Sequence, residues 1–349
     1  MENMNALVIH AYGDFRYEEI QKPKAGPGEV VVKIGAAGIC AADVKMYSQT
    51  QGPWPLNFPV ISGHEFVGTV EELGEGAAER FGLSIGDKAT AELIVPCRQC
   101  YYCKRGMYHH CINAVYLCIH DHGGMAEYMK FPANAIVHKI PKDVPLTEVV
   151  MAEPLSCAIH GVDLANIGLD DVVVVAGLGP IGMSMLQVCK LRTPRLLIGL
   201  SRRASINEIA KELGADYAFN VTKDDVVSEI NRLTDGIGCD VYMEASGNNE
   251  SLELGFELLR KSGKMLVMGV YEGKASLDFN YVSEFKELQI IGGHLSPNKF
   301  PLAIKYIAEG KVNARKMITH QFPLKDFKKA METKTKKTDE AVIKVILVP

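Results

Sequence analysis

The sequence predicts an α/β protein of two domains, a β-rich domain followed by a doubly wound parallel sheet. The chain has 349 residues, which exceeds the length at which a single hydrophobic core normally keeps growing. Up to about residue 150, short β-rich runs alternate with Gly and Pro turn signals. From about Met151 onward, strands alternate with helical patterns. Hydrophobic residues (47%) and charged residues (23%) occur in ordinary globular proportions.

The first domain is predicted from regularly spaced strand-like runs, which indicate a partly barrel-like region. The runs cover residues 6–20, 29–39, 65–74, 87–95, 126–132 and 135–141. Two further strand-like runs, 318–324 and 341–349, follow a helical segment at 300–310. We expect these two runs to return to the first domain, which makes that domain discontinuous.

The second domain is predicted from an alternation that is typical of a parallel sheet with helices on both faces. Its first strand is in the run 172–179, "VVVVAGLG", and an apolar-periodic helix follows. Further strands are expected at 195–200, 215–220, 239–247, 264–270 and 288–295, with helices at 206–214 and 252–263.

Charge and hydropathy exclude several classes of partner. The formal net charge is −4, and acidic residues interleave the Lys-rich run 325–337, so we expect no nucleic-acid partner. Residues 1–13 show no secretory signal, and we therefore expect a cytoplasmic protein. Residues 172–189 carry no charge, but three glycines and Pro180 interrupt any continuous helix there. We expect no membrane partner.

Four of the nine cysteines fall within "CRQCYYCKRGMYHHC", with the spacing CxxCxxCx7C. They are Cys97, Cys100, Cys103 and Cys111. In a cytosolic chain this pattern favours a metal over disulfides. Four thiolates close a tetrahedral shell around zinc and leave no open position, so we predict a structural zinc in a lobe at about residues 95–115. His109 and His110 flank the last ligand, but four cysteines already suffice.

A second set of metal-ligating side chains is dispersed along the chain. It comprises Cys40 in "GICAADVKMY", His64 and Glu65 in "SGHEFVG", and Glu153 in "AEPLSCAIH". Burial alone would explain Cys40. Together, the thiol, the imidazole and the two carboxylates match a catalytic zinc that keeps one position open. We expect Asp43 to accept the other ring N–H of His64 and so to fix its orientation.

A glycine-rich turn directly follows the first strand of the second domain. Gly177, Gly179 and Gly182 form GxGxxG, with Pro180 and Ile181 between the last two glycines. The pattern is weak by itself, but here it follows a strand and opens a helix. The glycines permit a tight turn and a close approach of the backbone, and the helix N-terminus attracts a pyrophosphate. We therefore predict dinucleotide binding.

The end of the second strand of this domain indicates which dinucleotide is bound. A carboxylate normally lies there and accepts the ribose 2′-OH of NAD, but this chain has Ser201, Arg202 and Arg203. A hydroxyl and guanidinium groups would bind a 2′-phosphate instead. We predict a preference for NADP(H) over NAD(H). The alternative is an exposed loop whose arginines point into water.

These motifs, in this order and over essentially the full chain, resemble the zinc-dependent medium-chain alcohol and polyol dehydrogenases. The sorbitol and erythritol/L-threitol types are the most similar, through "CRQCYYCKRGMYHHC", "AEPLSCAIHGVDLANIGLDDVVVVAGLGPIG" and "GGHLSPNKFPLAI". The resemblance implies a GroES-like catalytic domain at 1–153 and 295–349, a Rossmann domain at 154–294, and a cleft between them. It also implies a homodimer or homotetramer.

The resemblance also assigns roles to individual residues. Cys40 and His64 match the ligands of the catalytic zinc. Glu65 and Glu153 match two carboxylates of the family, which either ligate the metal or hold its water, and the resemblance does not decide which of the two ligates it here. The four lobe cysteines match the structural zinc, so two Zn²⁺ per chain are implied. Ala42 departs from the family, where a Ser or Thr hydroxyl often relays the substrate proton. With Ala42 in place, the substrate proton would leave through water, Glu153 or the cofactor ribose, and Lys45 is our candidate for the continuation of that route.

The implied reaction transfers a hydride between a secondary alcohol of a short polyol and the nicotinamide, with zinc as the Lewis acid, and gives a ketose. Candidates for polyol contacts are Tyr47, Trp54, Tyr116 and His294, although packing explains each of them. A threonine- or butanediol-type dehydrogenase stays open because it shares the motifs. A non-catalytic nucleotide-binding relative is favoured by Ala42 and opposed by the retained zinc residues. The acidic balance opposes a zinc-ribbon nucleic-acid module.

Overall fold

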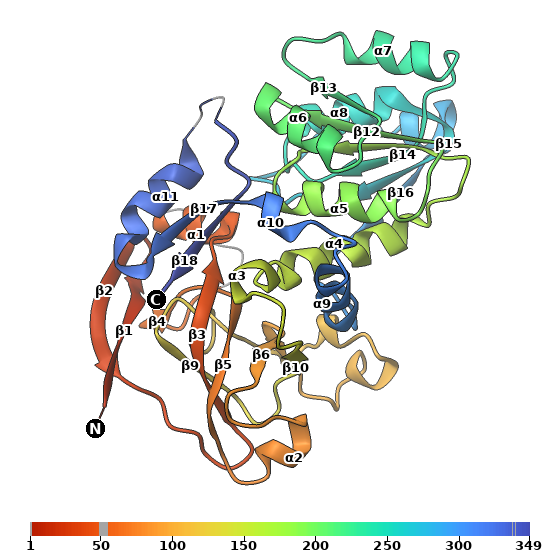
Figure 1. The fold of residues 1–349 in the computed structure, drawn as a ribbon. Helices are drawn as coiled ribbons and strands as arrows, with labels where there is room; N and C mark the ends of the chain where they lie inside the picture. Colours follow the sequence, from red (N-terminus) through yellow and green to blue (C-terminus); the bar gives the residue numbers. More distant parts are fainter. Residues whose placement is uncertain (1, 49–54, 337, 339) are drawn as a thin grey trace.

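A computed structural model describes residues 2–48, 55–336, 338 and 340–349. It places a β-rich part, which carries both ends of the described chain, beside a parallel sheet flanked by helices (Figure 1). The α/β fold predicted from the sequence is confirmed.

The β-rich part contains a three-stranded sheet (β2-β1-β4), a seven-stranded sheet (β10-β6-β5-β3-β18-β17, with β9 on β3) and the pair β7-β8. Its strands are β1 (Asn3–Ala11), β2 (Asp14–Gln21), β3 (Val30–Gly38), β4 (Val60–Ile61), β5 (Glu65–Leu73), β6 (Lys88–Ala91), β7 (Ile94–Val95), β8 (Val115–Tyr116), β9 (Tyr128–Phe131), β10 (Val137–Ile140), β17 (Ile318–Pro323) and β18 (Lys344–Val348). The late strands β17 and β18 thus join a sheet whose other strands all precede residue 141.

The other sheet has six strands in the order β13-β12-β11-β14-β15-β16, and every pair is parallel. The strands are β11 (Val172–Ala176), β12 (Leu196–Ser201), β13 (Tyr217–Asn220), β14 (Cys239–Glu244), β15 (Leu259–Val267) and β16 (Gln289–Gly292). The strand order reverses between β11 and β14, and in doubly wound sheets the carboxyl ends at that point bind ligands.

Helices and short helical turns connect and cover these strands. They are α1 (Ala41–Tyr47), α2 (Ala77–Phe81), α3 (Leu146–Val149), α4 (Ala152–Ala165), α5 (Pro180–Lys190), α6 (Ala204–Glu212), α7 (Val226–Leu233), α8 (Asn249–Leu258), α9 (Phe300–Ala308), α10 (Ala314–Met317), α11 (Phe327–Thr335), and the turns η1 (Cys103–Arg105), η2 (Tyr108–His110), η3 (Tyr281–Phe285) and η4 (Leu324–Asp326).

The valines of β11 explain why helices cover both faces of the parallel sheet. Val173 and Val175 pack in a core with side chains of α4, α5 and α9, whereas Val172 and Val174 pack in another core with side chains of α7 and α8. Successive side chains of a strand point to opposite faces. An uninterrupted apolar run is therefore the pattern of a strand that is buried on both sides.

Two sequence expectations concern the limits of a helix and of a domain. The helix predicted at 252–263 is wrong from residue 259, because α8 ends at Leu258 and β15 begins at Leu259 and pairs with β14. The mistaken residues, "LRKSG", are mostly polar and show no strand alternation, so only the pairing of Leu259 with Cys239 in β14 identifies the start of the strand. The domain boundary predicted between 153 and 154 lies inside the continuous helix α4. The boundaries therefore stay a prediction.

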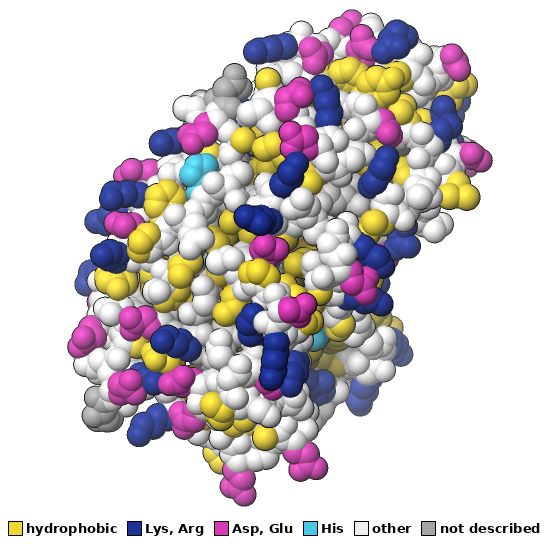
Figure 2. All heavy atoms as spheres, in the orientation of Figure 1, with side chains coloured by type: hydrophobic (Ala, Val, Ile, Leu, Met, Phe, Trp, Pro, Cys, Tyr) yellow, Lys and Arg dark blue, Asp and Glu magenta, His cyan; other side chains and the backbone are white. Residues whose placement is uncertain are grey.

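On the face shown in Figure 2, lysine and arginine side chains are interspersed with aspartate and glutamate. This mixed surface agrees with the near-neutral charge of the chain, −4. Among the helices of the described residues, none has the length and apolar composition needed to cross a bilayer.

Candidate functional site

Cys40, His64 and Glu65 lie together although the sequence separates the first from the other two. One potential ligand atom of each lies within 4.8 Å of the others. Strands β3 and β5 are antiparallel and place Gly38 opposite Glu65. Cys40 follows β3 at the N-cap of α1, and His64 directly precedes β5. The backbone pairing therefore brings the thiol to the imidazole and the carboxylate.

These side chains suit a zinc ion, because thiolate, imidazole and carboxylate are its usual ligands in proteins. The pKa of His64 is raised well above its ordinary value: burial opposes this shift, and the neighbouring thiols of Cys40 and Cys118 outweigh it. Glu153 is not part of the converged group of described residues.

Glu153 is buried in the first turn of α4 and accepts a hydrogen bond from the thiol of Cys157 at 3.7 Å. Burial raises the pKa of Glu153 to about 7, and the nearby Glu65 adds to this rise, while His64 and Lys344 oppose it. A carboxyl group with this pKa can exchange a proton near neutral pH.

The structure corrects our expectation for Asp43. Its buried carboxylate accepts the backbone N–H of Cys40 at 2.8 Å and the hydroxyl of Ser62 at 3.0 Å. No hydrogen bond joins it to His64 in the described part of the chain. Instead, Sγ of Cys118 lies 3.7 Å from Nδ1 of His64. Asp43 therefore fixes the backbone of Cys40, and Cys118 lies beside His64.

Cys118 escaped the sequence analysis because a single cysteine outside any motif carries no signal. It is buried and has a φ of 69°, which is uncommon for a residue other than glycine. The backbone strain at this position places a thiol next to a proposed zinc ligand.

Lys344 is a second residue that sequence reasoning missed. Its ammonium forms an ion pair with Oε2 of Glu65, and neither side chain is exposed by more than 2%. Burial lowers the pKa of Lys344, but Glu65 and Cys40 outweigh burial, so that the pKa is raised. Gly38 leaves room for the pair, because a Cβ there would lie 1.9 Å from Oε2 of Glu65.

The four lobe cysteines converge as the spacing predicts, with ligand atoms within 4.8 Å of one another. Backbone N–H groups point at their sulfurs: Cys97 N–H donates to Sγ of Cys111 at 3.3 Å. The pKa of Cys100 is lowered to about 6, mainly by the backbone N–H of Cys103. Four convergent thiols with backbone donors fit a closed zinc site.

The glycine motif forms the turn between β11 and α5. Gly177 has a φ of 87°, and a Cβ there would lie 2.5 Å from the backbone nitrogen of Ser246. A Cβ on Gly182 would lie 2.1 Å from the carbonyl oxygen of Gly177. Around Gly179, the N-cap of α5, the space is open. Pro180 and Ile181 form the first turn of the helix. The motif fits a pyrophosphate at the helix N-terminus.

The structure separates the roles of Ser201, the last residue of β12, and of Arg202 and Arg203, which follow the strand. The guanidinium of Arg203 donates to the backbone carbonyls of Glu340 at 3.3 Å and Val342 at 3.1 Å. The hydroxyl of Ser201 donates to the carbonyl of Arg203 and accepts its N–H. Arg202 is exposed. Arg203 thus connects the two parts of the molecule, and Arg202 is the guanidinium left for a cofactor.

The remaining candidates lie in different surroundings. Lys45 forms an ion pair with Glu272, from the segment after β15, at 3.4 Å. Tyr47 packs between Phe15 and Phe327, as expected for a core residue. Two further candidates for polyol contacts lie elsewhere: Tyr116 is in β8 and its ring lies beside that of His120, and the ring of His294 is stacked on that of His110. The last candidate, Trp54, lies outside the described residues.

Comparison with known proteins yields two family models, the alcohol dehydrogenase GroES-like domain at residues 26–142 and zinc-binding dehydrogenase at 180–309. Erythritol/L-threitol dehydrogenase of Mycolicibacterium smegmatis is 40% identical, over 100% of this chain and 98% of the relative. Sorbitol dehydrogenase of Halalkalibacterium halodurans is 34% identical, over 99% of each chain. A solved structure from Sinorhizobium meliloti 1021, bound to NADP, matches with a TM-score of 0.90 and 27% identity over 100% of both chains.

Proposed function

This chain belongs to the family of zinc-binding alcohol and polyol dehydrogenases, and from that premise we propose that it transfers a hydride between a secondary alcohol of a short polyol and a nicotinamide cofactor. The product of the oxidation is a ketose. The observation that carries the proposal is the convergence of Cys40, His64 and Glu65. The 40% identity to a relative named for erythritol and L-threitol supports the polyol class.

We propose that Cys40, His64 and one of Glu65 and Glu153 hold the catalytic zinc, and that the four lobe cysteines hold a second zinc. A zinc ion at the first site would lower the pKa of a bound alcohol. Asp43 holds the backbone N–H of Cys40, which positions the thiolate. The turn at Gly177 to Gly182 would hold the cofactor pyrophosphate.

The proton of the alcohol needs a route that Ala42 cannot supply, since alanine has no exchangeable proton. Glu153, with a pKa of about 7, can accept a proton at neutral pH. Lys45 is the proposed continuation towards solvent, where it meets Glu272. In this route Glu153 accepts the proton first, and Lys45 passes it on towards solvent.

A substrate screen tests the proposed reaction. With NADP⁺ or NAD⁺, we expect four- to six-carbon polyols to give kcat/KM values at least about tenfold above those of L-threonine and 2,3-butanediol, because tenfold corresponds to about 1.4 kcal/mol of selective transition-state binding. Absorbance of the reduced nicotinamide measures the rates. L-threonine or butanediol as the best substrate would make this chain a dehydrogenase of that type, and inactivity towards all of them would favour a non-catalytic relative.

We propose NADP(H) as the preferred cofactor, with Arg202 as the main ligand of the 2′-phosphate. Arg202→Ala should lower kcat/KM for NADP⁺ by about 10–100-fold and leave that for NAD⁺ nearly unchanged, because a charge-assisted hydrogen bond contributes about 1.5–3 kcal/mol. The matched control is Arg203→Ala, which removes the bonds to Glu340 and Val342 and should lower the melting temperature without changing the cofactor ratio. A wild-type enzyme that is more efficient with NAD⁺ would refute the preference.

We also propose that the protein assembles as a homodimer or homotetramer. Strand β16 ends the parallel sheet, and the side chain of Ile290 within it is 42% exposed. An edge strand presents unpaired backbone groups that a second copy can pair with.

A further inference from the structure

Four histidines gather between the zinc lobe and the rest of the molecule. They come from three segments: His109 and His110 from η2, His160 from α4, and His294 from the loop between β16 and α9. The ring centroid of His109 lies 4.0 Å from that of His110, 5.6 Å from that of His160 and 6.5 Å from that of His294. The ring centroids of His110 and His294 lie 5.6 Å apart. We call these residues the histidine cluster.

His109 is the central member of the cluster. Its side chain is 7% exposed, and among the described residues its Nδ1 has no hydrogen-bond partner. A buried polar atom without a partner is costly, and native structures rarely keep one without a reason. The other three imidazoles surround this atom's ring. The missing partner is therefore best sought in a ligand that imidazoles bind.

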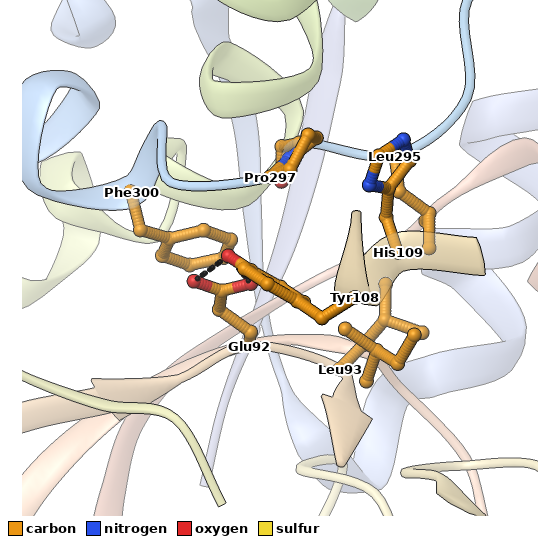
Figure 3. Close-up of a pocket in the computed structure, with 9 residues that line it drawn as sticks. Glu92, Leu93, Tyr108, His109, Leu295, Pro297 and Phe300 are labelled. Carbon is orange, nitrogen blue, oxygen red and sulfur yellow. Dashed lines mark hydrogen bonds between the residues drawn. The ribbon is translucent and has the colours of Figure 1, made fainter. Parts of the chain in front are cut away.

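The lobe and the loop are already tethered, which presets the distance between the histidines they carry. The hydroxyl of Tyr108, adjacent to His109, donates to Glu92 and accepts the backbone N–H of Asn298 at 2.7 Å. Figure 3 shows Tyr108 against Glu92, and His109 against the loop that carries Leu295 and Pro297. Little reorganisation of the backbone is needed to bring the rings together.

The ligand chemistry of the cluster suits a metal cation. Burial lowers the pKa values of His160 and His294. Neutral imidazoles are the form that binds metals, and Zn²⁺, Ni²⁺ and Cu²⁺ are the divalent ions that imidazole suits.

The ring positions are also close to those of a metal site. With a metal–nitrogen distance of about 2.0 Å, the centroids of two imidazoles on one tetrahedral ion lie about 5 Å apart, and the four ring pairs in contact have separations of 4.0, 5.6, 6.5 and 5.6 Å. The rings of His110 and His294 are stacked, with 17° between their planes. The ring nitrogens of these described histidines do not lie within 4.8 Å of one another as a group, so metal binding requires side-chain rotations that turn them towards a common point.

We propose that the histidine cluster is a third metal site, for a divalent transition-metal ion, that connects the zinc lobe to α4 and to the loop between β16 and α9. The site shares no residue with the two proposed zinc sites. An ion held there would cross-link three segments and stabilise the folded protein by mass action.

Nickel binding tests the proposal. Untagged protein, isolated with its own zinc, is dialysed against micromolar NiCl₂, and nickel and zinc are counted by mass spectrometry. We expect one nickel per chain with no loss of zinc, nitrogen-only ligation in the nickel X-ray absorption spectrum, and a higher melting temperature. The double variant His110→Ala/His160→Ala should bind nickel at least tenfold more weakly.

Two further variants keep the test decisive. His110→Ala alone changes an exposed side chain and serves if the double variant does not fold. The control is His10→Ala, which removes a histidine that pairs with Glu18 and that is distant from the cluster in the sequence. This variant should bind nickel as the wild type does. Nickel uptake equal to the zinc released, or undiminished uptake by both cluster variants, would overturn the proposal. Because zinc is counted separately, failure here is distinguishable from failure of the two proposed zinc sites.

Discussion

Replacement of Cys40 with alanine is expected to remove one zinc ion per chain and to lower kcat/KM by at least about 10³-fold. The thiolate is the softest of the converged ligands, and zinc sites depend on ligand type and number. A Lewis acid at the reacting oxygen contributes several kcal/mol to the transition state, and each 1.36 kcal/mol corresponds to tenfold in rate. Zinc counting and steady-state kinetics on the same sample measure both effects.

The matched control is Cys103→Ala in the lobe. It should also lower the zinc content from two to one per chain, but its main effect should be a lower melting temperature, because a structural zinc contributes directly to folding. Retention of two zinc ions by Cys40→Ala, with more than a tenth of the wild-type activity, would rule out Cys40 as a ligand of the catalytic metal.

Replacement of Lys344 with methionine is expected to destabilise the protein by about 3–5 kcal/mol, the usual effect of removing one partner from a buried ion pair. The variant leaves the carboxylate of Glu65 buried without its ammonium. Because the pKa of Lys344 is raised, its stabilising effect should be complete below the ordinary lysine pKa of about 10.4 and be lost as the pH rises through the folded-state value. Urea unfolding of the zinc-loaded protein at pH 8 measures the difference.

Two comparisons make this prediction specific. Lys325→Met changes a lysine on the exposed surface and should alter stability by less than about 0.5 kcal/mol. Adding Glu65→Gln to Lys344→Met should recover part of the lost stability, since the buried charge is then gone. If Lys344→Met were as stable as Lys325→Met, Glu65 would not depend on the lysine and would be neutralised by the metal alone.

The arrangement of strands and helices was largely accessible from the sequence. Buried strands such as β11 and helices such as α5 have periodic patterns that local physics explains. The error at Leu259 arose because the polar residues 260–262 carry no strand pattern, and the start of β15 is set by its pairing with β14. The return of β17 and β18 to the first sheet was expected, and it agrees with the pairing of β18 with β3 and of β17 with β18.

Side-chain partnerships were much less accessible. We expected Asp43 to meet His64, but Cys118 lies there. We expected Arg203 to face a phosphate, but its guanidinium binds carbonyls near the C-terminus. In each case the competing partner is more than 50 residues away along the chain, and no local pattern encodes such a distance.

The sequence by itself determined the kinds of ligand and the local turns, because a CxxC spacing or a GxGxxG turn fulfils its geometric requirement within a few residues. Only the tertiary structure decided which buried charges are paired. Lys344 reaches Glu65 because β18 returns to β3, and a carboxylate enters a low-dielectric interior only when a partner comes with it. The histidine cluster likewise exists only because the lobe, α4 and the loop after β16 meet in the folded chain.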